Sequence, residues 1–458
     1  MPESFDVIVI GAGQAGPPFA ARAGKEGLKV AVIERELMGG TCVNNGCIPT
    51  KTLVASARAA ANARRGADYG VMLDQPVRVD MHRVKARKDG IVQASRNGVA
   101  NWMEKAPNVT VIMGDARFTG SHEVEVNGRT LHAERIVINV GGRPAVPKLD
   151  GIESVPYLDN VSMMDVDFVP EHLIVVGGSY IGLEFAQMYR RFGSEVTVCE
   201  MGPRLIGRED EDVSDEVQAI LEREGITVRT NAACLAVERK GDRILAGLSC
   251  DDSPRVEGSH LLLATGRTPN TEDLGLAAAG IATDKRGFIT VNDSLETNVP
   301  GVYALGDVNG RGAFTHTSWN DYEILAANLF DSGKRRVTDR IPTYALFIDP
   351  PLGRAGMTLK EAKATGRPLL MAKMAMTRVG RARESGETQG FMKIVVDAET
   401  KRIRGASLLG LSGDEVVQSI LEVMYADKPY TSITNGVHIH PTVSELVPTL
   451  LEGLAPVV

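Results

Sequence analysis

The sequence lacks the features that mark membrane, secreted and nucleic-acid-binding proteins. It has no uninterrupted apolar run of about 18 residues, which argues against a membrane-spanning helix. It has no long basic run, and its net charge is -7 at pH 7, so nucleic acid and anionic membrane surfaces are poor candidate partners. The first residues, Met-Pro-Glu-Ser-Phe-Asp, include an acid and lead straight into a strand, unlike a signal peptide.

Cysteine is also scarce. The five cysteines stand at positions 42, 47, 199, 234 and 250. An odd, scattered set argues against a secreted disulfide framework and favours a reducing cytosol, where a close pair tends to be catalytic or metal-binding. We therefore expect a cytoplasmic protein.

Glycine, by contrast, is abundant, with 48 residues, and 43% of the residues are hydrophobic. This profile is typical of an α/β protein with tight strand-to-helix turns. At roughly 150 residues per domain, the length suggests about three domains.

Cys42 and Cys47 belong to one compact stretch, residues 39–51, which reads Gly-Gly-Thr-Cys-Val-Asn-Asn-Gly-Cys-Ile-Pro-Thr-Lys. An ideal helix would separate the two cysteines by about 7.5 Å along its axis, more than the usual Cα spacing of a disulfide, about 4.4 to 6.8 Å. A bridge therefore requires irregular backbone, which Gly46 and the two asparagines permit. We interpret the pair as a redox-active dithiol. A structural disulfide, half of a zinc site and two unrelated buried thiols remain open alternatives.

The N-terminal region carries a dinucleotide-binding pattern. An apolar strand over residues 5–10 leads into a Gly-x-Gly-x-x-Gly turn, then a helix, then a second strand that ends at Glu34, 23 residues after the first glycine. The glycines of the turn are Gly11, Gly13 and Gly16. They let backbone approach a pyrophosphate at the helix N-terminus, and Glu34 can accept hydrogen bonds from ribose hydroxyls. The alternative is a doubly wound fold without a nucleotide.

The same pattern recurs later in the chain. A strand over 173–176, a glycine turn, a helix and a strand that ends at Glu200 repeat the 23-residue offset. Ser179 stands where the middle glycine is usual, between Gly177 and Gly182. Two such units imply two dinucleotides. Glu200 would repel a 2′-phosphate and so favours NADH over NADPH.

Two features qualify the NADH preference. Arg204 and Arg208 follow closely and could partly reverse it. Alternatively, Glu200 is only a solvated strand end.

Polar residues at later strand ends are further candidates. The segment 136–144 ends a strand in glycines and proline, which suits a crossing between domains. Asp307, beside Gly306 at a strand end, is placed to bind a sugar-alcohol chain. A helix that begins near Thr315 would aim its positive end at an anionic group such as a reduced flavin.

Near the end of the chain, His440 and Glu445 are separated by Pro-Thr-Val-Ser. They could be a base and the acid that orients it. A satisfied structural histidine is the alternative.

Taken together and in this order, these motifs resemble the flavoprotein disulfide reductases, the family of dihydrolipoamide dehydrogenase, glutathione reductase and mercuric reductase. The resemblance covers essentially the whole chain. The stretch 39–51 is its most specific motif. Ala-Thr-Gly-Arg-Thr-Pro-Asn at 264–270, Leu-Gly-Asp-Val at 305–308 and His-Pro-Thr-Val-Ser-Glu at 440–445 support it.

The resemblance implies an α/β fold with two Rossmann-like nucleotide-binding domains, for FAD and NAD(P)H, plus a C-terminal α+β dimerisation domain. The expected segments are 1–145 for the first part of the FAD-binding domain, 146–268 for the NAD(P)H-binding domain, 269–338 for the second FAD or central part, and 339–458 for the dimerisation domain. The expected partner is a second copy of the chain.

The resemblance also implies roles for single residues. Cys47 corresponds to the cysteine nearest the flavin, whose thiolate makes the charge-transfer contact, and Cys42 to the interchange cysteine that meets the substrate. Lys51 would approach the flavin and pair with Glu184. Tyr180 would be the gate over the flavin face where the nicotinamide enters.

His440 and Glu445 would complete the active site of the other subunit, where His440 acts as base toward Cys42. No resident metal site is expected. The expected FAD-binding positions are Gly11, Gly13, Gly16, Glu34, Gly40, Thr41, Lys51, Ala116, Gly141, Gly306, Asp307 and Thr315. Those for NAD(P)H are Gly177, Gly182, Glu184, Glu200 and Gly266.

Within the family, the second half looks most like the mercuric-reductase-like group that includes the bacterial reactive-chlorine-resistance flavoproteins, which are associated with copper(II) or hypothiocyanous acid. The stretches that carry this likeness are 314–322, 344–357 and 380–383. The C-terminal vicinal cysteines and the N-terminal metal-binding domain of true mercuric reductases are absent from the sequence, so mercury reduction ranks low.

The expected activity is electron transfer from NAD(P)H through FAD to the cysteine pair, and on to a small thiol, oxidant or metal ion. Dihydrolipoamide dehydrogenase is the alternative within the family. A flavin-bearing redox sensor or binding protein is the alternative from another class.

Overall fold

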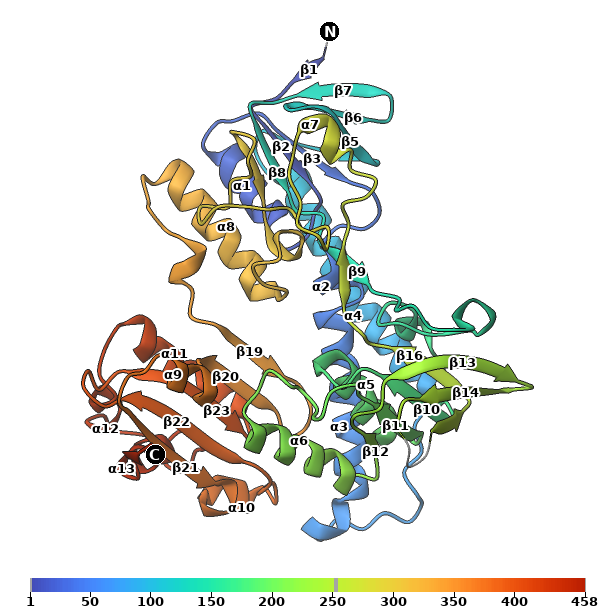
Figure 1. Ribbon diagram of the computed structural model, residues 1–458, viewed down its shortest axis with the longest axis vertical. Coiled ribbons are helices and arrows are strands. Elements are labelled where there is room, and N and C mark those ends of the chain that lie inside the picture. The colour runs from blue at the N-terminus through green and yellow to red at the C-terminus, as the bar shows by residue number, and fades with distance from the viewer. Residues whose placement is uncertain (1, 251–253, 458) are drawn as a thin grey trace.

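The computed structural model describes residues 2–250 and 254–457. Figure 1 shows an upper unit, a lower unit that contains α5 and β10, and a C-terminal unit beside it. No helix within the described residues is long and apolar enough to cross a membrane.

The upper unit is built on a five-stranded parallel sheet in the order β18-β8-β2-β3-β4. The strands are β2 (Val7–Ile10), β3 (Val30–Glu34), β4 (Val109–Met113), β8 (Arg135–Ile138) and β18 (Val302–Ala304). Every residue of β2 is buried, as in parallel sheets that are covered on both faces. Helices α1 (Gly16–Lys25) and α8 (Thr315–Phe330) pack against each other. Because β18 and α8 come from late in the chain, this unit is discontinuous in sequence.

A four-stranded sheet in the order β1-β7-β6-β5 adjoins this unit. Its strands are β1 (Glu3–Ser4), β5 (Ala116–Gly120), β6 (Glu123–Val126) and β7 (Arg129–His132). The short helix α7 (Leu276–Ala279) packs on β5.

The second unit repeats the parallel arrangement in the order β12-β11-β10-β16. These strands are β10 (His172–Val176), β11 (Glu195–Cys199), β12 (Thr227–Arg229) and β16 (His260–Leu263), with helices α5 (Tyr180–Phe192) and α6 (Glu211–Arg223). An antiparallel sheet of β13 (Cys234–Lys240), β14 (Arg243–Leu248) and β15 (Arg255–Gly258) follows. Strands β9 (Gly142–Pro144) and β17 (Arg267–Pro269) pair where the chain crosses between the two units.

The C-terminal unit is a six-stranded antiparallel sheet in the order β19-β20-β23-β22-β21-β24. Its strands are β19 (Thr343–Leu346), β20 (Leu352–Gly356), β21 (Leu369–Ala375), β22 (Phe391–Asp397), β23 (Ile403–Leu409) and β24 (Ala455–Pro456). Its helices are α9 (Leu359–Ala364), α10 (Gly380–Glu384), α11 (Gly413–Tyr425), α12 (Thr431–Thr434) and α13 (Leu446–Glu452). Helix α11 packs on β20 and β23.

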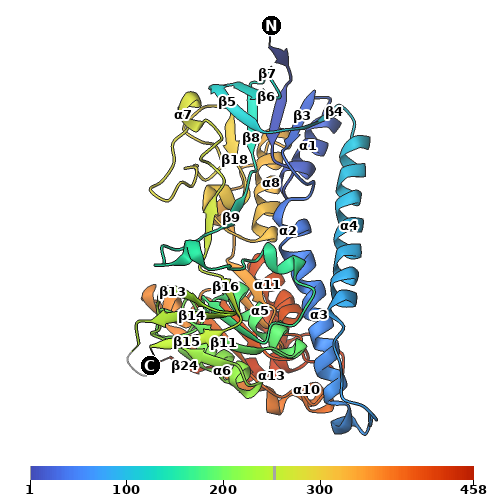
Figure 2. The same cartoon turned by 90° about the vertical axis from the view of Figure 1, so that its right-hand side faces the viewer.

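Two long helices connect the units. Figure 2 shows α3 (Cys47–Arg64) and α4 (Met81–Lys105) running along one side of the molecule, and α3 packs against both α4 and α5. The short helix α2 (Gly40–Asn44) precedes α3. Helix α3 begins at Cys47 itself. The break between α2 and α3, at Asn45 and Gly46, is the irregular backbone expected between the two cysteines.

A buried ionic cluster joins the C-terminal sheet to the start of α6. Lys393 is 2% exposed, and its Nζ lies 2.7 Å from Asp210 Oδ2 and 2.6 Å from Asp212 Oδ1. Its cross-strand neighbour Lys373 pairs with Asp212 at 2.7 Å but is 39% exposed. The two lysines therefore form similar contacts at very different burial.

We expect Lys393→Met to lower the free energy of unfolding by about 3 to 5 kcal/mol, because it leaves the buried Asp210 carboxylate without its ammonium partner. The control Lys373→Met should cost only about 0 to 1 kcal/mol, since water screens an exposed pair. Urea unfolding of both variants measures the difference. Equal losses would contradict this account.

Candidate active site

Cys42 lies in α2 and Cys47 is the first residue of α3, in the segment that follows β3 and packs against the first glycine turn. Gly39 has a φ of +96° and its N–H donates to the carbonyl of Ala12 at 2.9 Å. Gly40 has a φ of +60°, and a Cβ there would lie 2.8 Å from the Cα of Gly13. A side chain at Gly40 would therefore push the cysteine loop away from the nucleotide turn.

The pKa values of Cys42 and Cys47 are shifted in opposite directions. The pKa of Cys47 is lowered to about 6, mainly by the hydrogen bond from Cys42. The hydrogen bond with Thr315 and the charge of Lys51 also lower it. Thr315 Oγ1 lies 3.1 Å from Cys47 Sγ. The same Cys42–Cys47 hydrogen bond, together with burial, raises the pKa of Cys42. One thiolate is therefore favoured, and it resides on Cys47.

We expect a titration of the reduced protein to show one thiolate forming at an apparent pKa near 6. Because the pKa is lowered, the thiolate persists above pH 6 and is lost as the pH falls through that value. In Cys42→Ala the pKa of Cys47 should rise, since its largest lowering interaction, the hydrogen bond from Cys42, is gone while Thr315 and Lys51 still favour the thiolate. Absorbance at 240 nm, with Cys47→Ser as the baseline, measures this. A wild-type midpoint above pH 8 would contradict the assignment.

A half-buried ion pair lies next to the cysteines. Lys51, one turn along α3 from Cys47, places its Nζ 2.7 Å from Glu184 Oε2 on α5. Glu184 is 5% exposed, and its other oxygen accepts from the N–H of Phe347 at 3.0 Å. The Lys51 ammonium also lies 4.5 Å from the centre of the Phe347 ring. From α3, Lys51 therefore contacts both the second unit, through Glu184, and the C-terminal unit, through Phe347.

The first glycine turn fits a dinucleotide. Gly11 has a φ of +98°, and a Cβ there would lie 2.4 Å from the carbonyl oxygen of Asn139. The first turn of α1 has no acidic side chain and no side-chain cap, which favours a pyrophosphate there. The Glu34 carboxylate is fixed by the N–H groups of Ala12 and Glu36, at 2.8 and 2.9 Å. It keeps acceptor capacity for ribose hydroxyls.

A second polar group, Asp307, lies in the short 3-10 helix Gly306–Asn309 that follows β18. Asp307 follows Gly306, and the Nε of Arg267 lies 3.3 Å from its Oδ2. Burial raises the pKa of Asp307. Among the described residues, nothing lies within 4 Å of a Cβ placed at Gly141, so open space adjoins that position. The glycine turn, the carboxylates of Glu34 and Asp307 and the open space beside Gly141 together fit FAD. Glu34, the glycine turn and Asp307 would hold it.

Three further predicted positions surround the same region. Thr41 is the second residue of α2, and its Oγ1 lies 3.5 Å from the guanidinium of Arg267. Ala116 begins β5, two residues after Gly114, whose N–H donates to the carbonyl of Glu34. Gly16 begins α1, and a Cβ there would lie 2.3 Å from the carbonyl oxygen of Gly11.

The second glycine turn is built in the same way. Glu200 accepts from the N–H groups of Gly178 and Gly202, each at 2.7 Å, as Glu34 does in the first unit. Gly177 has a φ of +116°, and a Cβ at Gly182 would lie 2.0 Å from its carbonyl oxygen. Gly266, with a φ of +135°, is the remaining predicted glycine of this unit and has open space around it among the described residues.

Tyr180 is the first residue of α5, directly after this turn. Its half-buried ring lies 5.4 Å from the ring of Phe314, the residue before α8. Phe314 in turn precedes Thr315, which contacts Cys47. The Tyr180 ring therefore lies between the second glycine turn and the cysteine site.

His440 and Glu445 form a pair of their own. The Nδ1 of His440 lies 2.9 Å from Glu445 Oε2, and the histidine is 79% exposed whereas the glutamate is 14% exposed. Figures 1 and 2 both show α13, which follows Glu445, well away from α2. Within one chain the structure therefore does not bring His440 to Cys42.

Asn139 was missed as a candidate binding residue. It is 5% exposed at the end of β8, where its Oδ1 accepts from the N–H of Gly16 and its Nδ2 donates to the carbonyl of Leu305. The amide therefore ties the first glycine turn to Leu305, which directly precedes the short helix that carries Asp307. A single polar residue after a buried apolar strand was the available signal.

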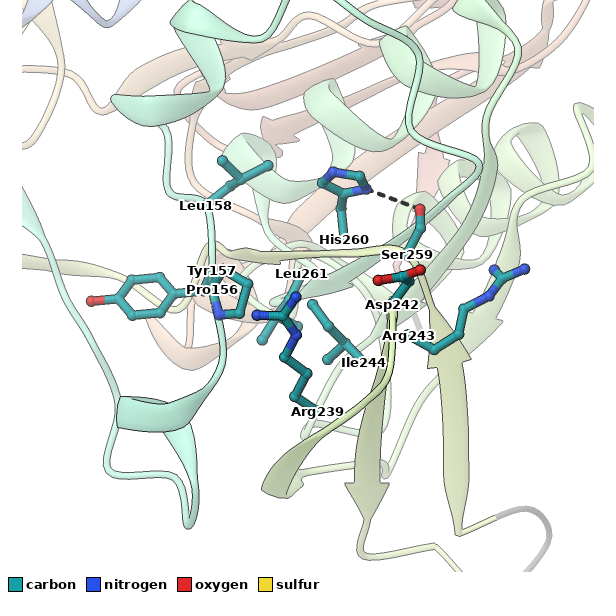
Figure 3. A pocket seen from close by; sticks show the side chains of 10 residues that line it. All are labelled: Pro156, Tyr157, Leu158, Arg239, Asp242, Arg243, Ile244, Ser259, His260 and Leu261. Atoms are coloured by element: carbon teal, nitrogen blue, oxygen red, sulfur yellow. Dashed lines mark hydrogen bonds between the residues drawn. The ribbon is translucent and has the colours of Figure 1, made fainter.

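Two cavities lie outside this site. One, of about 280 Å³, opens on the second unit beside β14 and β16, where His260 Nδ1 lies 2.9 Å from Ser259 Oγ (Figure 3). The other, of about 560 Å³, lies between the end of α3, the end of α5 and the C-terminal unit. No predicted site residue lines either cavity.

Comparison with known proteins agrees with this architecture. Residues 5–321 match the pyridine nucleotide-disulphide oxidoreductase family, and residues 342–451 match its dimerisation domain. The chain is 34% identical to the probable pyridine nucleotide-disulfide oxidoreductase RclA of Escherichia coli, over 96% of this chain and 97% of that protein. It is 33% identical to dihydrolipoyl dehydrogenase of Thermus scotoductus, over 99% and 98%. It is 31% identical to mercuric reductase of Lysinibacillus sphaericus, over 99% and 82%.

Among solved structures, the HOCl-induced flavoprotein disulfide reductase RclA from Escherichia coli superposes with a TM-score of 0.89. Sequence identity is 34%, and the match covers 98% of this chain and 99% of that one. The α/β fold, the dimerisation domain and the use of FAD and NAD(P)H expected from the sequence are confirmed. The chain belongs to the pyridine nucleotide-disulphide oxidoreductase family and is an NAD(P)H-dependent flavoprotein disulfide reductase.

Proposed function

We propose that this reductase takes electrons from NADH and delivers them, through FAD and the Cys42–Cys47 pair, to a small oxidant or a metal ion. One observation carries the proposal. Cys47, whose pKa is lowered to about 6, lies 3.1 Å from Thr315 at the start of α8, beside the first glycine turn. A thiolate held at neutral pH is the form that reacts with electrophiles.

The cysteine chemistry follows from this asymmetry. When bound, FAD supplies the two-electron relay between the nicotinamide and the cysteine pair. Uptake of two electrons and one proton opens the Cys42–Cys47 disulfide into one thiol, on Cys42, and one thiolate, on Cys47. The cation of Lys51 stabilises that thiolate.

Delivery to the acceptor needs a base. In a homodimer the partner subunit's His440 takes the proton from Cys42, and the partner subunit's Glu445 holds the imidazole in place. With an electrophilic oxidant, the Cys42 sulfur attacks the oxidant, and Cys47 then attacks Cys42 to close the disulfide and release the reduced product. With cupric ion, closing the disulfide releases two electrons and so reduces two Cu(II) ions to Cu(I). The match of residues 342–451 to the dimerisation domain supports such a homodimer.

The preference for NADH rests on the charges behind β11. Glu200 is held at the second turn, where it would repel a 2′-phosphate. Arg204 pairs with Asp215 and lies 3.4 Å from Glu211, so its charge is largely compensated. Arg208 is exposed and works in the opposite direction.

The acceptor class is suggested by similar proteins. The Escherichia coli flavoprotein is described as HOCl-induced and has been solved as a Cu(II) complex. We therefore propose cupric ion or hypothiocyanous acid as the acceptor, in the cytoplasm. We also propose domain limits at 1–145, 146–268, 269–338 and 339–458.

Dihydrolipoamide dehydrogenase is the second candidate, since the enzyme of that name from Thermus scotoductus is 33% identical and the chain carries the histidine-glutamate pair. A redox sensor that uses the same site is a weaker alternative, because the chain carries a full set of nucleotide-binding and thiol residues.

The test is a steady-state panel of lipoamide, oxidised glutathione, mercuric ion, cupric ion, hypothiocyanous acid and quinone, each with NADH and NADPH. We expect cupric ion or hypothiocyanous acid with NADH to give the highest kcat/KM. A comparable value with lipoamide would favour the second candidate. Slow turnover with every acceptor, together with redox-dependent binding of a protein partner, would favour the sensor.

A further inference from the structure

Three aromatic rings, Phe314, His316 and Tyr344, form what we call the ring stack. The ring of Phe314 lies 5.2 Å from His316 at 10° and 5.8 Å from Tyr344 at 3°. The ring of Tyr180 leans on Phe314 at 5.4 Å and 41°. Tyr180 therefore contacts Phe314, the residue before α8, and Phe314 in turn stacks on Tyr344 of β19.

The far side of the ring stack is anchored by a buried acid. The Tyr344 hydroxyl donates to Glu209, and Glu209 also pairs with Arg354. The side chains of Glu209 and Arg354 are 1% and 3% exposed. His316 Nε2 lies 2.8 Å from the carbonyl oxygen of Thr343, the neighbour of Tyr344. Because both ring neighbours of Phe314 are held, the stack has little freedom to shift.

The same acid is tied to the second nucleotide turn. The N–H of Glu209 donates to the carbonyl of Ile206, and the N–H of Ile206 donates to the carbonyl of Gly178, each at 2.9 Å. Gly178 stands two residues before Tyr180. The contacts therefore form a closed chain. It runs from Gly178 through Ile206 and Glu209 to Tyr344, and from Tyr344 through Phe314 back to Tyr180. Figure 1 shows β19, which carries Tyr344, between α8 and α6.

We propose that Phe314 and Tyr344 are positioning residues that hold the Tyr180 ring in its closed place, so that nicotinamide must break the Tyr180–Phe314 contact to enter. This inference rests on the proposed role of Tyr180 as the gate. The favourable free energy of the Tyr180–Phe314 contact is then lost when the nucleotide binds, and this loss weakens nucleotide binding. Removing the Phe314 ring should strengthen nucleotide binding by about threefold to tenfold.

The test uses the oxidised holoenzyme and NAD⁺, whose dissociation constant is measured by calorimetry, with NADH kinetics alongside. We expect Phe314→Leu to lower the NAD⁺ dissociation constant and the KM for NADH by about threefold to tenfold, with kcat changed less than about twofold. Tyr180→Leu should give the same gain, and the double variant no further gain, because both remove one contact. Phe330→Leu, at the other end of α8 beside Phe19, is the matched control and should change neither constant.

If Phe314→Leu does not fold, Tyr344→Phe, which loses only the hydroxyl that binds Glu209, should shift the NAD⁺ dissociation constant in the same direction by a smaller factor. A gain in Tyr180→Leu without one in Phe314→Leu or Tyr344→Phe would overturn the inference and leave the gate intact. No gain in Tyr180→Leu would overturn the gate role itself, while acceptor turnover by the wild-type enzyme would still report separately on the proposed function.

Discussion

Replacing Cys42 by Ser should lower NADH-dependent reduction of the acceptor by on the order of a thousandfold, while FAD stays bound. Only a thiolate attacks a disulfide or a soft metal ion at a useful rate, and a serine hydroxyl does not replace it. Cys47→Ser should have the same effect, because the pair must open and close together. Steady-state acceptor assays and the flavin content, from the visible absorbance of the purified protein, measure the two parts of the prediction.

Cys234→Ser is the matched control for this loss. Cys234 is a half-buried cysteine at the start of β13, in the second unit and away from the first glycine turn. Its replacement should change turnover by less than about twofold, as expected for a surface-near substitution that touches no site. Unchanged acceptor turnover in Cys42→Ser or Cys47→Ser would remove the cysteine pair from the proposed mechanism.

Mixing two inactive variants should restore about a quarter of the wild-type activity. Cys42→Ser and His440→Ala homodimers each lack one half of every site. If the subunits reassociate at random, half of the molecules are heterodimers, and each of these has one complete site of two, made of Cys42 from one chain and the partner subunit's His440. The measurement is acceptor turnover after joint unfolding and refolding of the two variants in equal amounts.

The control is each variant refolded alone, which should stay inactive. The physical basis is that His440 is 79% exposed and pairs with Glu445. The helix that follows this pair, α13, lies well away from α2 in Figure 1. If the mixture recovers no activity although heterodimers form, the site is not shared between subunits.

Local patterns in the sequence were sufficient for the two nucleotide units. A buried apolar strand, a glycine turn and an acid at a fixed offset are short-range features, and the backbone of each turn requires glycine, as Gly11 and Gly177 show. The same is true of the break between Cys42 and Cys47, which Asn45 and Gly46 make possible. These features could be predicted because their cause lies within a few residues.

The antiparallel sheet of β13 to β15 was missed for a related reason. Most residues of β13 are exposed or half-buried, and only Val237 is buried, so the strand carries no clear alternation of apolar residues. The strand is defined by its antiparallel pairing with β14, which its own sequence does not reveal.

What the sequence determined by itself is which residues can do chemistry: the two cysteines, the acids after the glycine turns, and the histidine with its glutamate. Tertiary structure alone decided which of them meet. Lys51 reaches Glu184 across 133 residues, Thr315 reaches Cys47 across 268, and Phe314 joins Tyr180 to Tyr344. Such contacts depend on how whole units pack, because the free energy that holds them comes from burial shared among all three units and not from the residues themselves.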